Sequence, residues 1–499
     1  MSLIKKLAGE TAVYGLSSIL GRVVNWGILT PYLTRIFSPE DYGIINIVFT
    51  AIALLLVLYT YRMETTYFRF ARGGQTDDTW DAATVFTTAT MSIAATTLLF
   101  TGLLFLLTPW LTNWLLEPGM EHYFHLLLVI VALDAVAAIP FARLRLTNRP
   151  VRFATIKLAA IGLNIVLVFF FLKWLPQWAN RGVTWATTWY AEEARISYYF
   201  LANVIASGVT LLWLLPLYRG VVWQFATALW RKMLHYALPL VLAGVAGIVN
   251  QLIGTPLLKL LGPGTAEENF ALGGIYAAAA KLAVLMNLFV QAFNYAAEPF
   301  FFRQSGQSND KQIYADVARA FALVGSLAFL GIMLYRDLIQ YFLGEDFRQG
   351  LGILPILLIA NFFLGLFYNF SMGFKLTDQT HLGGKVAILG SVITLGINIL
   401  FIPSLTIYAP AWASLACFFT MCVTTYWLTY KHWPVPYALG RMAYYLVLGV
   451  GTWALCVGLR GWLPVGLGYT LGLNTVGFWG SLVVLYLTEK QWITSVLKT

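Results

Sequence analysis

Apolar runs of similar length, separated by short polar segments, recur along the whole chain. Each run approaches the ~20 residues that an α-helix needs to cross a bilayer. The pattern therefore predicts an all-α polytopic membrane protein with about 14 transmembrane helices. The expected spans are residues 9–34, 42–62, 83–108, 123–142, 153–173, 196–218, 235–260, 272–297, 314–335, 351–373, 385–402, 409–430, 441–460 and 468–487.

The composition excludes a water-soluble fold. Of the 499 residues, 59% are hydrophobic and 11% are charged, whereas ordinary soluble domains carry about 25% charged residues. The spans and their loops account for the whole length, so no stretch remains for a soluble catalytic domain. The first apolar run is too long for a secretory signal and contains Arg22 and Asn25, so we interpret it as the first span.

Basic residues are unevenly distributed between the two sets of loops. The formal net charge is +10, but lysines and arginines gather at alternate loops and acids at the opposite set, which is the positive-inside pattern. This distribution argues against nucleic-acid binding and places the basic loops in the cytoplasm. Because the number of predicted spans is even, both termini are expected there as well. The basic set includes Lys5, Lys6, Arg69, Arg72, Arg143, Arg145, Arg149, Arg152, Arg231, Lys232, Arg303 and Lys311.

The sequence also contains an internal repeat. Residues 24–33 (VNWGILTPYL) match residues 249–258 (VNQLIGTPLL) at an offset of 225 positions. Three further matches follow in the same order: 64–69 with 298–303, 145–148 with 375–378, and 162–165 with 396–399. The repeat predicts two six-helix lobes in parallel orientation, followed by two extra C-terminal helices.

The predicted divisions are an N-lobe over residues 1–218, a C-lobe over 219–432 and the two extra spans over 433–499. Two lobes related by an axis along the membrane normal, with the substrate site at the repeat interface, are typical of transporters. We therefore expect alternating access of the two lobes around a central cavity.

Charged and polar side chains within the spans are the candidate substrate-binding residues, because such groups are costly in hydrocarbon and usually mark a pathway. Arg22 precedes Asn25 by three residues, so both can face one way. The guanidinium fork suits phosphate, and Lys281 adds a positive charge in the other lobe. Arg62 and Asn250, the repeat mate of Asn25, complete the set; the asparagines alternatively hydrogen-bond between helices.

Three acids are candidates for ion coupling or for a gate. Asp134 lies near the middle of the fourth span. It is either a proton or cation site or a simple ion-pair partner of Arg22 or Lys281. Glu64 and its repeat mate Glu298 lie near the cytoplasmic ends of their spans, where they can pair with loop arginines in an inner gate.

Two other charged residues and one loop have membrane-surface interpretations. Lys157 and Arg319 lie one turn inside their spans and are expected to extend toward lipid phosphates. The only long outward loop, Trp174 to Ala194, has three tryptophans spaced seven and four residues apart. They share a helical face, so the loop is either an interfacial helix or part of an aromatic belt.

Motifs for enzymatic chemistry are missing. The three cysteines all lie in apolar runs, so we expect no disulfide and no metal site. Residues 383–385 (GGK) lack the spacing of a phosphate-binding loop. The acids in residues 38–41 (SPED) could suggest a membrane glycosyltransferase, but a cap, a proline and two acids also begin a helix. We expect neither an enzyme nor a cofactor.

The run SSILGRVVNWGILTPYLTRIFSPEDYGIINIVF, the basic loop PFARLRLTNRPVRFATIK and the layout of six, six and two spans resemble the Wzx-like polysaccharide-biosynthesis flippases of bacteria. These move O-antigen and capsule repeat units and belong to the MOP superfamily, with the lipid II flippase MurJ and the MATE multidrug exporters. The resemblance implies a monomeric flippase of the bacterial inner membrane. Its substrate would be undecaprenyl-diphosphate-linked oligosaccharide, moved from the cytoplasmic to the outer leaflet.

The resemblance further implies a cationic central cavity for the diphosphate, H⁺ or Na⁺ as candidate coupling ions, and contact with the polysaccharide polymerase machinery. As in MurJ, the last two helices would form a groove for the lipid tail. Three alternatives stay open: lipid II as the substrate, a MATE-like antiporter of cations or drugs, and a membrane transferase or polymerase. Short loops disfavour the transferase, and Arg22 and Lys281 disfavour a carrier of cations.

Overall fold

The structure is a computed structural model that describes the backbone of residues 3–71, 80–304, 310–377, 379–462 and 466–498. Within these ranges it is helical throughout, without any β-strand. Side chains are described for the same residues except 3–18, 295–296, 298–304, 310, 380 and 495–498. Contacts divide the chain into two compact units, Met1–Gly274 and Ile275–Thr499.

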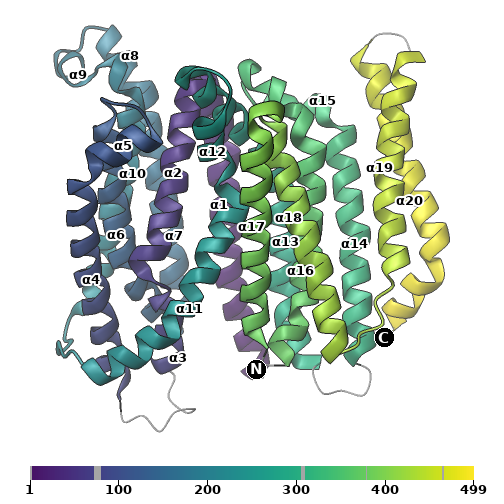
Figure 1. Ribbon diagram of the computed structural model, residues 1–499, viewed down its shortest axis with the longest axis horizontal. Helices are drawn as coiled ribbons and strands as arrows, with labels where there is room; N and C mark the ends of the chain where they lie inside the picture. The colour runs from purple at the N-terminus through teal and green to yellow at the C-terminus, as the bar shows by residue number, and fades with distance from the viewer. Residues whose placement is uncertain (1–2, 72–79, 305–309, 378, 463–465, 499) are drawn as a thin grey trace. The chain divides into compact units, whose positions relative to one another are not determined.

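The first unit contains α1 (Leu3–Ile36), α2 (Pro39–Thr60), α3 (Met63–Ala71), α4 (Ala82–Leu106), α5 (Thr108–Leu115), α6 (Glu121–Leu146), α7 (Pro150–Phe169), the π-helical turn η1 (Phe170–Trp174), α8 (Leu175–Asn180), α9 (Thr184–Trp189), α10 (Arg195–Leu214), α11 (Thr227–Leu252), α12 (Gly254–Leu261) and the start of α13 (Ala266–Gln304). The second unit contains the rest of α13, α14 (Asp310–Leu334), α15 (Arg336–Ile339), α16 (Leu354–Leu376), α17 (Thr380–Leu405), α18 (Tyr408–His432), α19 (Leu439–Leu459) and α20 (Leu467–Lys498). Figure 1 shows the long helices of each unit running side by side.

Thirteen helices in the described parts of the chain are long and apolar enough to cross a membrane, and they correspond to the predicted spans two to fourteen. The first predicted span falls within α1, which has 34 residues and whose side chains are described only from Ile19 onward. The predicted all-α polytopic fold is confirmed.

Helix packing in the first unit centres on α6 and α2. α6 packs against α2, α4 and α10, while α7 packs against α1 and α10. α11 and α12 also join this unit through contacts with α2, although the repeat assigns both to the C-lobe. The repeat-based domain boundaries concern sequence similarity and stay a prediction.

The start of α2 illustrates how local sequence positions these helices. Ser38 has an extended backbone, and its Oγ accepts a hydrogen bond from Asp41 N at 3.1 Å. Pro39 occupies the first helical turn, where a missing N–H costs nothing. The acids that follow are therefore the first turn of a helix, as expected from the sequence.

In the second unit α16 and α18 pack along their lengths, with α17 on α18 and α14 on α16. Their core is rich in aromatic side chains, including Phe321, Phe362 and Phe370. The last two helices, α19 and α20, pack on each other and on α14. They are therefore part of the second unit.

Candidate functional site

Six helices of the first unit, α1, α2, α3, α6, α7 and α10, surround a cavity of about 610 Å³. Its ionisable lining residues are Arg62, Glu64, Asp134, Arg145 and Lys157. Its amide and hydroxyl residues are Asn25, Thr60, Asn164, Asn203, Ser207 and Thr210. Because charged side chains are costly among transmembrane helices, this concentration in one cavity marks the strongest candidate site in the described chain.

Asp134 and Lys157 form the oppositely charged centre of the cavity. Asp134 interacts electrostatically with Lys157 and has Ser207 as a hydrogen-bond partner. Lys157 also lies near enough to Arg145 and Arg22 for their like charges to act on it. The three positive charges of Lys157, Arg145 and Arg22 therefore exceed the single negative charge of Asp134. This excess of positive charge attracts an anion that enters the cavity.

The expectation that Lys157 extends to lipid phosphates is wrong, since the side chain lines this cavity. Its Nζ lies 4.1 Å from the centroid of the Phe141 ring, another lining residue. The physical reason is the helical face: Lys157, Ile161 and Asn164 lie four and seven residues apart and all line the cavity.

Arg62 and Glu64 enter the cavity at a break between α2 and α3. Tyr61 and Arg62 both have positive φ angles, 33° and 58°. Arg62 Nη1 lies 3.9 Å from Glu64 Oε1, a loose pairing. Glu64 Oε2 is buried without a hydrogen-bond partner among the described residues, so it is available to a cation, a proton or a hydroxyl group.

The amides of the cavity come from three different helices. Asn25 lies on α1, Asn164 on α7 and Asn203 on α10. Asn164 Nδ2 is buried and lacks a hydrogen-bond partner in the described chain, whereas Asn203 Nδ2 donates to Tyr199 O at 2.8 Å. The cavity thus offers a ligand both an acceptor, at Glu64, and a donor, at Asn164.

Of the eight predicted site residues, Asn25, Arg62, Glu64 and Asp134 line this cavity together. The other four do not line it, although Arg22 lies near enough to act on the charge of Lys157. Arg22 is exposed on α1 and Asn250 is buried on α11. Lys281 is partly buried on α13 in the second unit, and the side chain of Glu298 lies outside the described residues.

Sequence reasoning missed Arg145, Lys157, Asn203 and Ser207 as lining residues. A signal was present, because Asn203, Ser207 and Thr210 recur at helical spacing on one face of α10. Asp134 and Arg145, eleven residues apart, likewise share a face of α6.

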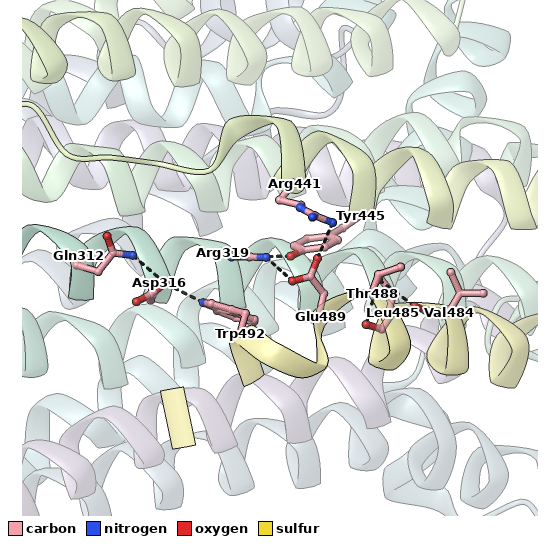
Figure 2. Close-up of polar contacts among 10 residues, drawn as sticks. All are labelled: Gln312, Asp316, Arg319, Arg441, Tyr445, Val484, Leu485, Thr488, Glu489 and Trp492. Carbon is pink, nitrogen blue, oxygen red and sulfur yellow. Dashed lines mark hydrogen bonds and ion pairs between the residues drawn. The ribbon is translucent and has the colours of Figure 1, made fainter. Parts of the chain in front are cut away.

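A second polar cluster lies in the second unit, where α14, α19 and α20 meet (Figure 2). The Glu489 carboxylate is fully buried and pairs with Arg319 and, at 3.4 Å, with Arg441 Nη1. Arg319 Nε donates to Tyr445 Oη at 2.8 Å, and its guanidinium lies over the Trp492 ring. The expectation that Arg319 extends to lipid phosphates is therefore wrong, because the buried carboxylate of α20 holds it.

An apolar pocket of about 460 Å³ lies between α16, α18 and α19 in the same unit. It is lined by Phe362, Phe363, Leu366, Phe370, Phe419, Cys422, Val423, Tyr426, Leu439, Met442, Ala443, Leu446 and Val447. Phe419, Val423 and Val447 are also exposed on the surface of the protein. The pocket therefore opens at the surface of the second unit.

The sequence matches the family described as "Polysaccharide biosynthesis protein" over residues 7–305. No curated protein sequence gives a significant match. Among solved structures, the lipid II flippase MurJ in an inward closed conformation aligns with a TM-score of 0.69 and 12% identity, over 96% of this chain and 99% of that one.

Two structures described as a multidrug resistance MATE family transporter of the MOP superfamily also align. The inward-facing structure gives a TM-score of 0.59 at 14% identity, over 85% of this chain and 94% of that chain. The outward-facing structure gives 0.58 at 13%, over 85% and 95%. At such low identity the similarity demonstrates a shared fold. The resemblance to polysaccharide-biosynthesis proteins inferred from the sequence is confirmed by the family match.

Proposed function

The chain belongs to the polysaccharide biosynthesis protein family, and from this premise we propose that it is a lipid-linked oligosaccharide flippase. It moves undecaprenyl-diphosphate-linked oligosaccharide from the cytoplasmic to the outer leaflet of the bacterial inner membrane. Membership of the family, in a chain with the fold of MOP transporters, is the observation that carries the proposal. A flippase needs no catalytic residue, and none is assigned.

The polar headgroup is recognised by the cavity of the first unit. Arg62 and Lys157 contact the diphosphate, because a guanidinium fork and an ammonium are the usual phosphate ligands in proteins. Asn25 and Asn164 hydrogen-bond to sugar hydroxyls. Arg22, Lys281 and Asn250, predicted from the sequence, are further proposed contacts.

The lipid tail occupies the apolar pocket between α16, α18 and α19. The pocket provides a hydrocarbon chain with an aromatic and aliphatic wall and an opening toward the bilayer. α19 is the first of the two C-terminal helices that the resemblance associates with tail binding. α20 supports this wall through the Glu489 cluster, which binds α19 on the face adjacent to the pocket.

Ion coupling is assigned to Asp134, with Glu64 and Glu298 as gate residues. An entering diphosphate competes with Asp134 for Lys157, and the displaced carboxylate then binds H⁺ or Na⁺. The cycle of inward and outward opening follows from differential binding of substrate and ion to the two states. The transport unit is a monomer.

The deciding experiment is deletion of the gene in its host, followed by extraction and mass analysis of polyprenyl-linked lipids. We expect one diphosphate-linked oligosaccharide to accumulate and to resist a membrane-impermeant oxidant applied to spheroplasts, because it stays in the cytoplasmic leaflet. Reintroducing the intact chain restores its exposure. An unchanged lipid profile in the deletion strain would falsify the flippase assignment.

Two alternatives have an observation in their favour. The fold similarity to MurJ suggests lipid II as the substrate, in which case the chain sustains growth of cells depleted of their lipid II flippase. The carboxylates of Asp134 and Glu64 in the cavity suggest a MATE-like antiporter, in which case deletion increases sensitivity to cationic drugs. The oligosaccharide flippase predicts neither result.

A further inference from the structure

Arg62 enters the cavity at the break between α2 and α3, and a chain of hydrogen bonds from α11 reaches this break. Tyr61 Oη lies 2.5 Å from Ser92 Oγ on α4, and both side chains are buried. Ser92 Oγ also accepts a hydrogen bond from Trp230 Nε1 on α11 at 2.7 Å. The chain therefore runs from α11 through α4 to the residue that directly precedes Arg62.

The direction of the hydrogen bond at the α11 end follows from the chemistry of indole. An indole N–H can only donate, so Ser92 Oγ is the acceptor there, and its own hydroxyl proton is available to Tyr61 Oη. In this arrangement the two hydrogen bonds polarise one another. Loss of the bond from Trp230 therefore also weakens the bond that holds the Tyr61 ring.

The break needs such support because its backbone conformation is unfavourable. Tyr61 and Arg62 have φ angles of 33° and 58°, which residues other than glycine adopt only when their surroundings hold them there. The anchored ring of Tyr61 is one of these surroundings. Since Arg62 follows Tyr61 directly in the chain, the anchor also fixes the point from which the Arg62 side chain departs.

A second part of α11 lies against the Arg62 side chain itself. A Cβ added at Gly244 would lie 2.7 Å from Arg62 Nε and Nη2, so the backbone of α11 borders the guanidinium. Between these two contacts, the Arg69 guanidinium of α3 lies 4.2 Å from the centroid of the Tyr236 ring. α11 thus packs along α2, α3 and α4 on both sides of the break, and Figure 1 shows it running obliquely past α3.

We propose that Trp230 and Ser92 are positioning residues for the headgroup site, because docking of α11 on α4 holds Arg62 in the orientation that binds phosphate. The described lining of the cavity includes neither side chain, so both act through Tyr61 and not by contact with the substrate. The inference rests on the proposed function and names what regulates the same site.

The regulation follows from the place of α11 in the chain. The sequence repeat assigns α11 to the C-lobe, whereas its contacts join it to α2, α3 and α4 of the first unit. A movement of the C-lobe that draws α11 away from α4 breaks the bond between Trp230 and Ser92. The cavity then loses the support of Arg62 and binds an anion more weakly, which favours release of the headgroup.

The test is calorimetric titration of the full chain in nanodiscs with inorganic pyrophosphate. Trp230→Phe keeps an aromatic ring and removes the indole N–H. We expect it to weaken pyrophosphate binding about fivefold, the effect of losing the net contribution of one hydrogen bond. Trp223→Phe changes an exposed indole shortly before α11. It is the matched control and should leave the affinity unchanged.

A double-mutant cycle distinguishes positioning of Arg62 from a general structural effect. Arg62→Gln should weaken pyrophosphate binding about tenfold, since it removes a charged ligand of the anion. Adding Trp230→Phe to Arg62→Gln should cause no further loss, because Trp230 acts through Arg62. Equal losses from Trp230→Phe in both backgrounds would overturn the proposal, and so would unchanged affinity in the single variant.

Two further variants interrupt the same chain and leave the Trp230 indole in place. Ser92→Ala removes the shared oxygen, and Tyr61→Phe removes the hydroxyl at the other end. Each should weaken pyrophosphate binding as much as Trp230→Phe does. They decide the question if thermal unfolding shows that Trp230→Phe does not fold, and full affinity in both would contradict the proposal.

The outcomes for this inference and for the proposed function are separate. Restored export when the intact chain is reintroduced into the deletion strain tests the flippase, whereas the affinity ratio between Trp230→Phe and the intact chain tests the positioning role. Restored export together with equal pyrophosphate affinities would contradict this inference alone. An intact chain that binds no pyrophosphate would contradict the headgroup site, and this inference with it.

Discussion

Tyr61 and Arg62 are two consecutive residues with a left-handed backbone conformation, which costs about 1–3 kcal/mol for each residue. Contacts nearby maintain this conformation: Tyr61 Oη lies 2.5 Å from Ser92 Oγ, which also accepts from Trp230 Nε1 at 2.7 Å. This break in the helix directs the Arg62 side chain into the cavity. In a continuous helix the side chain would point in another direction.

A glycine on α11 keeps space for the Arg62 guanidinium. A Cβ added at Gly244 would lie 2.7 Å from Arg62 Nε and Nη2 and 3.0 Å from Val57 Cγ1, whereas one added at Gly247 meets nothing. We expect Gly244→Ala to lower the stability of the protein by about 1–3 kcal/mol and to reduce oligosaccharide export. Gly247→Ala is the control. Thermal unfolding and complementation measure both effects, and equal behaviour of the two variants would contradict this role of Arg62.

Lys157 provides a direct test of anion binding in the cavity. We expect Lys157→Gln to weaken binding of inorganic pyrophosphate about tenfold, since a charge-assisted hydrogen bond is worth about 1.5–3 kcal/mol. Lys173→Gln changes an exposed lysine on the same continuous helix and should have no effect. Calorimetric titration of the protein in nanodiscs measures both affinities. Unaltered affinity in Lys157→Gln would remove this lysine from the site.

At the scale of elements, the Glu489 cluster (Figure 2) joins three helices through one buried carboxylate. Arg441 and Tyr445 lie one turn apart on the face of α19 toward Glu489. Met442 and Leu446 lie on the adjacent face and line the apolar pocket. The polar cluster thereby fixes the rotation of α19 and, with it, the wall of the pocket.

Removing that carboxylate leaves two arginines without their partner. We expect Glu489→Ala to destabilise the second unit by about 3–5 kcal/mol, the usual cost of breaking a buried ion pair. Glu345→Ala breaks a pair whose carboxylate is 86% exposed and should cost about 1 kcal/mol or less. Thermal unfolding in detergent compares the two. The charge exchange Arg319→Glu/Glu489→Arg should recover part of the loss.

The apolar pocket can be filled without disturbing the cluster. Ala443 lines the pocket, so the indole of Ala443→Trp would occupy the space that we assign to the lipid tail. We expect this substitution to reduce cross-linking of a photoactivatable polyprenyl phosphate to the second unit by about tenfold, because the tail loses the burial of a comparable apolar surface. Ala454→Trp, an exposed position farther along α19, is the control. Equal cross-linking in both variants would place the tail elsewhere.

The helical class, the positions of thirteen of the predicted spans and the start of α2 could be predicted, because each depends on residues close together in the sequence. The joining of Asn25, Arg62, Glu64 and Asp134 in one cavity could not, since it depends on how α1, α2, α3 and α6 pack. The sequence predicts that Lys157 and Arg319 extend toward lipid phosphates because both lie near the end of a span. This prediction is wrong because the depth of a residue within a span does not indicate which side of the helix faces protein.

For the whole molecule, the family match ends at residue 305, so it covers the first unit and α13. The fold similarity to MurJ covers 96% of the chain, so it extends into the second unit beyond the end of the family match.

Energy coupling is a property of the complete transport cycle. We expect export by the intact chain in proteoliposomes to slow when an ionophore abolishes the proton or sodium gradient, because the proposed coupling at Asp134 makes the return of the empty carrier depend on that ion. Asp134→Asn cannot bind the ion, so it should transport slowly with or without the ionophore. Ser207→Ala, which removes only a hydrogen-bond partner of Asp134, should retain the response. Gradient dependence in Asp134→Asn would exclude this residue from coupling.

The buried carboxylate of α20 has a consequence for biogenesis. Arg319 and Arg441 are synthesised 170 and 48 residues before Glu489, so both cations enter the membrane before their counter-charge exists. Insertion of a charged residue at the centre of a helix costs about 2.5–3.5 kcal/mol; Arg319 lies within α14 and Arg441 in the first turn of α19, so the cost is smaller for these two. The last helix therefore neutralises the ones before it, and a nascent chain that stops short of α20 carries two uncompensated arginines. Quality-control proteases of the membrane could use that charge to distinguish an unfinished chain from a finished one.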